Sequence, residues 1–89
     1  MAYVYYLVDQ ALNAKMTTKV VLGILSDLYR NRDYEKELFN FYALSYAKKE
    51  LEEVGEQFYW DGANNDNIDT IINSEFLEWK NRYESMQVN

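Results

Sequence analysis

The chain contains no histidine and no cysteine, and this removes most of the chemistry that small proteins use for catalysis. Histidine is the commonest general base and metal ligand, and cysteine is the side chain that supplies a thiolate nucleophile. Disulfides, zinc sites built on these residues, and Ser/His/Asp or Cys/His catalytic sites are therefore excluded. The phosphate-binding patterns G-x-x-x-x-G-K-S/T and G-x-G-x-x-G are also missing. We expect a protein that is not an enzyme and that binds no cofactor and no metal.

Carboxylates are the acid–base groups that remain, and three of them flank a polar loop. Asp61, Asp66 and Asp69 suggest a calcium-binding loop at first sight. The EF-hand pattern fails, because its third position is Ala63, its glycine position is Asp66 and its glutamate position is Ile72. We therefore expect these aspartates to serve in the loop and in helix capping. A hydrolase built on two carboxylates stays open as an alternative, because the fold sets such pairs.

Proline is absent and glycine occurs only at positions 23, 55 and 62. A chain made of β-strands needs many turns, which Gly and Pro usually mark, so their scarcity favours helices joined by a few polar loops. The 89 residues are 48% hydrophobic and 17% aromatic, enough for a core without disulfides. The sequence predicts an all-α fold, a small bundle of three to four helices around a long central helix, in one domain over residues 1–89.

Long apolar runs are also missing. The longest, residues 3–8 and 20–25, are far shorter than a membrane span. The first basic residue is Lys15, so the N-terminus lacks the charged region of a signal peptide. We expect a cytoplasmic protein that makes no contact with a membrane.

Three segments of the chain have helical patterns outside the central stretch. Residues 2–14 fit a helix, with an N-terminal strand as the alternative, because AYVYYLV is rich in β-formers. Thr17 is the expected N-cap of the second helix, which Arg30-Asn31-Arg32 closes. Asp66 or Asn67 is expected to cap the last helix. That helix has the cleanest apolar row of the chain: Ile68, Ile72, Phe76, Trp79, Tyr83 and Met86.

The central helix is predicted from Tyr34 to Trp60, with Asp33 as its cap. An earlier end at Gly55, as a left-handed residue, is the alternative. We favour the longer helix, because Phe58 continues its apolar stripe. We expect that stripe to be buried against the core: Ala43, Ala47, Leu51, Val54 and Phe58.

A second apolar row lies on roughly the opposite side of this helix. It consists of Leu38, Phe39, Tyr42 and Tyr46. Either other helices of the chain cover this row, or it is an interface for a partner, since tyrosine is common at interfaces. The sequence leaves both interpretations open.

Charge divides the chain unevenly around a net −6. Residues 1–33 carry four basic and three acidic groups, whereas residues 34–89 carry five basic and twelve acidic groups. Such an acidic half argues against direct binding of nucleic acid. The densest acidic run is Glu50, Glu52, Glu53 and Glu56. It is either a solvated helix face paired with Lys48 and Lys49, or an anionic surface for a basic partner.

Taken together, these features predict a small acidic helical protein that binds and occupies the surface of a partner protein. The predicted partner-binding residues are Leu38, Phe39, Tyr42, Tyr46, Glu52, Glu53 and Glu56. By analogy of composition, the chain suits the inhibitors of nucleic-acid-binding proteins that mobile genetic elements encode. The alternative is a structural homodimer or adaptor that packs through the aromatic helix face.

Overall fold

The computed structural model describes residues 2–31 and 36–87, and within them the chain forms four α-helices and one 3-10 turn. The elements are α1 (Ala2–Leu12), α2 (Thr18–Asn31), the turn η1 (Lys36–Leu38), α3 (Phe39–Glu53) and α4 (Ile68–Gln87). No strand occurs in these residues, and the predicted all-α bundle is confirmed.

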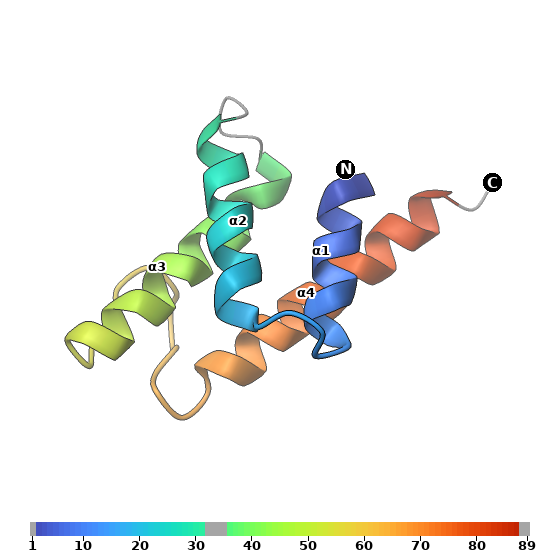
Figure 1. The fold of residues 1–89 in the computed structure, drawn as a ribbon. Coiled ribbons are helices and arrows are strands. Elements are labelled where there is room, and N and C mark those ends of the chain that lie inside the picture. The colour runs from blue at the N-terminus through green and yellow to red at the C-terminus, as the bar shows by residue number, and fades with distance from the viewer. Residues whose placement is uncertain (1, 32–35, 88–89) are drawn as a thin grey trace.

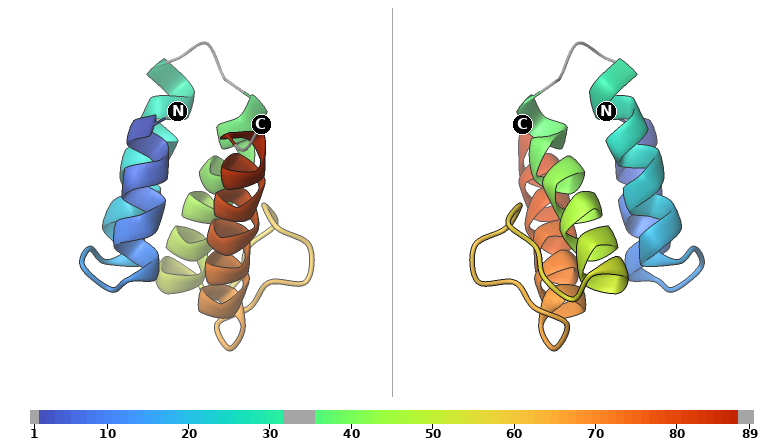
Figure 2. Two further views of the ribbon diagram at one scale, coloured as in Figure 1. Left: turned by 90° about the vertical axis from the view of Figure 1, so that its right-hand side faces the viewer. Right: turned by 90° about the vertical axis from the view of Figure 1, so that its left-hand side faces the viewer.

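The helices form two layers, with α1 and α2 on one side and α3 and α4 on the other (Figures 1 and 2). Within each layer the two helices run in opposite directions. Across the layers, α2 packs mainly on α3, and α1 packs mainly on α4. The molecule measures 44 × 28 × 22 Å.

The first segment is a helix and not a strand. Val4, Leu7, Val8 and Ala11 are buried, and their spacing places them on one helical face. The β-forming residues between them do not change the outcome, because packing against the core outweighs a local preference of this size. The predicted helix in residues 2–14 is therefore confirmed, and it covers Ala2–Leu12.

A polar and aromatic contact joins α1 to α4 at the surface. Asp9 Oδ1 accepts a hydrogen bond of 2.9 Å from Lys80 Nζ, and Tyr5 donates its hydroxyl proton to Glu84 at 2.5 Å. The ring of Tyr5 also stacks on Tyr83, with centroids 5.1 Å apart. These contacts connect the two ends of the chain across 71 to 79 positions.

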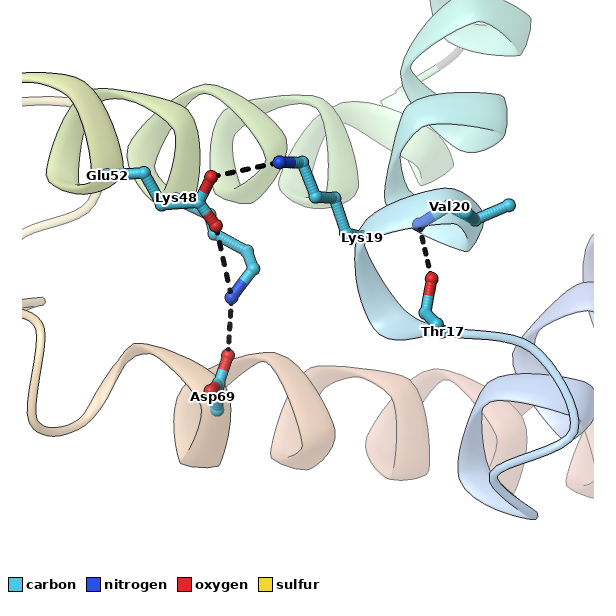
Figure 3. A network of polar contacts seen from close by, with 6 residues as sticks. All are labelled: Thr17, Lys19, Val20, Lys48, Glu52 and Asp69. Atoms are coloured by element: carbon cyan, nitrogen blue, oxygen red, sulfur yellow. Dashed lines mark hydrogen bonds and ion pairs between the residues drawn. The ribbon is translucent and has the colours of Figure 1, made fainter.

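The start of α2 is capped as predicted. The Thr17 hydroxyl accepts a hydrogen bond of 3.2 Å from the Val20 amide, which would otherwise have no partner inside the helix (Figure 3). The helix ends at Asn31, with Arg30 in its last turn, and buries Val21 and Leu25.

Most of the predicted apolar row of α4 lies in the core. Ile68, Ile72, Phe76 and Trp79 are buried, and the rings of Phe76 and Phe41 lie 5.4 Å apart. The row leaves the core toward the C-terminus, where α4 extends past α1 (Figure 1) and Met86 is exposed.

The central helix is shorter than predicted at both ends. It begins at Phe39, after the 3-10 turn, and the expected cap Asp33 lies outside the described residues. Its end at Trp60 was the wrong choice, because α3 stops at Glu53. Gly55 has a left-handed backbone, with φ of +86°, and its amide donates to the carbonyl oxygens of Glu50 and Leu51 at 3.2 and 3.1 Å. A glycine in this position satisfies the last carbonyls and turns the chain out of the helix.

This early end divides the apolar stripe of the central helix. Ala43, Ala47 and Leu51 are buried as predicted. Val54 and Phe58, which we expected to be buried, are 67% and 93% exposed. The expectation fails because α3 ends at Glu53: Val54 is its C-cap, with a non-helical backbone, and Phe58 lies in the following loop, so neither continues the helical period.

The first prediction compares two apolar residues of this stripe. Leu51→Ala should lower the free energy of unfolding by about 2–5 kcal/mol, because it leaves a cavity in a packed core. Phe58→Ala should change it by less than about 0.5 kcal/mol, as substitutions of exposed residues do. Urea unfolding of the two variants measures both values. Equal losses would mean that Phe58 is part of the core and that the helix continues beyond Gly55.

Candidate partner-binding surface

Five aromatic rings from three parts of the chain form a continuous series, which we call the aromatic surface. Its members are Tyr29 on α2, Phe39, Tyr42 and Tyr46 on α3, and Tyr59 in the loop that follows α3. Successive ring centroids lie 5.9 Å (Phe39–Tyr29), 4.7 Å (Tyr29–Tyr42), 5.0 Å (Tyr42–Tyr46) and 5.5 Å (Tyr46–Tyr59) apart. These are ordinary distances for tilted and edge-to-face pairs, so the rings support one another.

The predicted aromatic row is therefore partly core and partly surface. Leu38 is fully buried, whereas Phe39 is 49% exposed. Tyr42 and Tyr46 are half-buried, with one side of each ring against its neighbours. Part of the row is thus covered by other helices of the chain, as one of the two alternatives expected, and part of it is exposed. Whether these residues bind a partner stays a prediction.

Cations lie along one side of the aromatic surface, in a shallow groove between α2 and α3 that includes Lys19, Arg30, Tyr46 and Lys49. Arg30 donates to the Tyr46 hydroxyl at 3.2 Å and pairs with Asp27 at 2.5 Å. The Asp27 carboxylate raises the pKa of Arg30 further above its ordinary value. Arg30 thus orients Tyr46 and is neutralised within the fold.

Negative charge is concentrated in one stretch of the chain. Between positions 50 and 79 the chain has nine carboxylates and no lysine or arginine. The nine are Glu50, Glu52, Glu53, Glu56, Asp61, Asp66, Asp69, Glu75 and Glu78. This stretch includes the end of α3, the whole α3–α4 loop (residues 54–67) and the first half of α4.

The three predicted acidic residues have different surroundings. Glu52 accepts from Lys19 at 3.0 Å and lies 3.8 Å from Lys48, which also bonds Asp69 at 2.8 Å (Figure 3). This network links α2, α3 and α4, and it confirms the expected Lys48–Glu52 pair. The hydrogen bond from Lys19 lowers the pKa of Glu52 below its ordinary value.

Glu53 and Glu56 are exposed, and neither forms an ion pair with a residue in the described ranges. Glu56 follows Gly55, so it is not on the helix, and the helical spacing assumed between Glu52 and Glu56 does not exist. Glu56 therefore belongs to the α3–α4 loop. Glu53 is the last residue of α3 and lines a groove with Lys19 and Lys49, and Glu52 is part of the network that joins three helices.

The α3–α4 loop has an internal structure that sequence reasoning missed. Gln57 makes four hydrogen bonds: its amide nitrogen donates to the carbonyls of Trp60 (2.5 Å) and Ala63 (3.0 Å), and its amide oxygen accepts from the amides of Tyr59 (2.8 Å) and Trp60 (2.7 Å). Trp60 is half-buried against the core. The predicted helix from Tyr34 to Trp60 includes Gln57, whereas the alternative end at Gly55 leaves this residue in a loop, where the structure has it.

The second half of the loop is held by two asparagines. Asn67 accepts from the Asn64 amide at 2.7 Å, and Asn64 accepts from the amides of Asp66 and Asn67 at 2.8 and 3.0 Å. Asn67 also donates to the Gly62 carbonyl at 3.0 Å. The loop lies on the outer side of the α3/α4 layer, away from α1 and α2 (Figure 2).

Two tests for other kinds of site are negative over the described part of the chain. No group of three or more Asp, Glu, His or Cys residues is arranged to hold a metal ion there. No helix within it is long and apolar enough to cross a membrane. Comparison with protein-family models, with curated proteins and with solved structures finds no match to this chain.

The second prediction concerns pH. Hydrogen bonds from Lys80 and Lys19 lower the pKa values of Asp9 and Glu52 in the folded state. A carboxylate with a lowered pKa stabilises the fold above its unfolded pKa, and this stability is lost as the pH falls through the folded pKa. The free energy of unfolding should therefore be flat between about pH 6 and 8 and decrease below roughly pH 4.

Urea midpoints measured across this range test the prediction, and Asp9→Asn should flatten part of the acid decrease. A steep transition between pH 6 and 8 would contradict it. With no histidine or cysteine in the chain, no side chain has its ordinary pKa in this range. A steep transition that persists after acetylation of the N-terminal amino group would indicate a strongly shifted side chain, and shifts of that kind cluster at active sites.

Proposed function

We propose that this chain acts without catalysis, by binding a partner protein through the aromatic surface and the α3–α4 loop beside it. This loop carries Glu56, Asp61 and Asp66, and we call it the acidic loop. One observation supports the proposal: five contacting aromatic rings, partly open to solvent, end at Tyr59, which lies within a stretch of thirty residues that holds nine carboxylates and no lysine or arginine. Half-exposed tyrosines supply large contact areas with little loss of side-chain freedom. The partner is expected to carry a basic surface.

The charge distribution supports a protein partner more than a nucleic acid. Phosphate groups would be repelled by the acidic loop, and the cations Lys19, Arg30 and Lys48 already pair with carboxylates of the chain. Basic surfaces are common on nucleic-acid-binding proteins, so an acidic domain bound there would compete with the nucleic acid. In this proposal the chain inhibits such a protein in the cytoplasm. A chain without cysteine forms no disulfides and so does not depend on an oxidising compartment.

The third prediction applies to the partner isolated by pull-down from the native host and then purified. Its affinity should fall steeply as ionic strength rises from low to physiological, because salt screens exposed charges. Glu56→Lys should lower the association rate about 3- to 10-fold at low salt, while Glu78→Lys, the same charge change on the exposed side of α4, should have a smaller effect.

Phe39→Ala tests the aromatic half of the same surface. It should raise the dissociation rate at least about tenfold and leave the fold intact, because Phe39 is half-exposed. Surface plasmon resonance measures both rates. Binding that is independent of salt, of Glu56 and of Phe39 would contradict the proposal. A dimer in solution that buries Phe39 would instead favour the alternative, a homodimer packed through this surface.

A further inference from the structure

Phe58 is the most exposed large apolar side chain among the described residues, with 93% of its surface open to solvent. Isolated apolar residues are common on protein surfaces, so exposure alone does not indicate a site. The unusual feature is that both sides of Phe58 are fixed. The preceding residue, Gln57, makes four hydrogen bonds, and two residues further on Trp60 packs on the core.

These contacts hold Phe58 out of the core. The amides of Tyr59 and Trp60 are both bonded to the Gln57 side chain, which closes a tight turn with Phe58 inside it. The next ring, Tyr59, lies 5.5 Å from Tyr46 and so joins this turn to the aromatic surface. An ordered turn that keeps a phenylalanine in water has already lost the freedom that a flexible loop would lose on binding.

The charged residues close to Phe58 in the sequence indicate what kind of surface it can meet. Glu53, Glu56 and Asp61 are the charged residues within five positions on either side, and all three are exposed carboxylates. None of them forms an ion pair in the described part of the chain. An anionic lipid surface or a nucleic acid would be repelled here, whereas lysines and arginines of a protein would be attracted.

We infer that the α3–α4 loop presents Phe58 as an anchor that inserts into an apolar pocket of the partner protein, and that lysines or arginines surround this pocket. The inference rests on the proposed function and adds the residue that fixes the position of the complex. An aromatic anchor in a desolvated pocket with charged residues around it is the usual arrangement of a binding hot spot. Gln57 is a positioning residue in this arrangement and does not itself contact the partner.

Photo-crosslinking locates the contact. A chain with p-benzoylphenylalanine in place of Phe58 is produced in the cells that normally make it, irradiated, and analysed by mass spectrometry. The control carries the same group in place of Leu77, a half-exposed apolar residue on α4 beside the α1–α2 connection. A protein crosslinked from position 58 and not from position 77 is expected, with the crosslink in an apolar pocket bordered by Lys or Arg.

The protein identified by crosslinking is then purified without the crosslink. Isothermal titration calorimetry measures its affinity for each variant and so separates the roles of Phe58 and Gln57. Phe58→Ala should weaken binding at least about thirtyfold, and Leu77→Ala should leave it unchanged. Gln57→Ala keeps the phenyl ring but loosens the turn, so it should weaken binding about 3- to 10-fold with a less favourable binding entropy. All three substitutions lie outside the buried core, and circular dichroism should show the same helix content.

The outcomes distinguish this inference from the proposed function. If Phe58→Ala binds like the parent chain while Phe39→Ala and Glu56→Lys bind weakly, the anchor is wrong and the proposed function stands. If none of these substitutions affects binding, or if position 58 crosslinks only to nucleic acid or lipid, both are wrong. A crosslink to a second copy of this chain would overturn the inference in favour of the homodimer.

Discussion

The left-handed backbone of Gly55 is the constraint on which the surface of this protein depends. α3 stops at Glu53, where the Gly55 amide donates to the carbonyls of both Glu50 and Leu51 and the left-handed backbone of Gly55 turns the chain out of the helix. Had the helix continued, Phe58 would face the core and Glu56 would lie one turn after Glu52. With the stop, the next residues form a loop on the outer side of the α3/α4 layer (Figure 2). An alanine at position 55 would have to adopt the same positive φ, which side chains disfavour.

Negative charge has two separate roles in the fold. Glu52 and Asp69 are held by Lys19 and Lys48, so they help to keep three helices together (Figure 3). The pairs are partly exposed, and pairs of this kind contribute modestly to stability. Glu56, Asp61 and Asp66 in the loop form no ion pair with any residue that the structure describes, and they concentrate negative potential where Phe58 and Tyr59 are exposed. The same acidic segment thus supplies the ion pairs that join three helices and the carboxylates of the proposed interface.

The sequence predicted most of the fold and about half of the candidate surface. Helical periodicity predicted α1 and α4, because Val4 and Phe76 belong to apolar rows with helical spacing. The start of α2 was predicted from Thr17, which is its N-cap. The end of α3 at Gly55 was the alternative that we did not favour, because periodicity cannot decide whether a glycine ends a helix or lies within it. Gln57 was missed for a related reason: its four hydrogen bonds form only after the backbone has turned. The partial burial of the aromatic row follows from how α2 meets α3, which no spacing within one helix can show.

The α3–α4 loop is an ordered support that holds Phe58 in solvent. Backbone order parameters from NMR relaxation test this most directly, because they report motion on the timescale that distinguishes a fixed turn from a flexible loop. We predict order parameters of about 0.85 for residues 57–60, similar to those of the helices. Values below about 0.6 for these residues, with the helices rigid, would contradict the claim, because Phe58 would then be exposed only as part of a flexible segment.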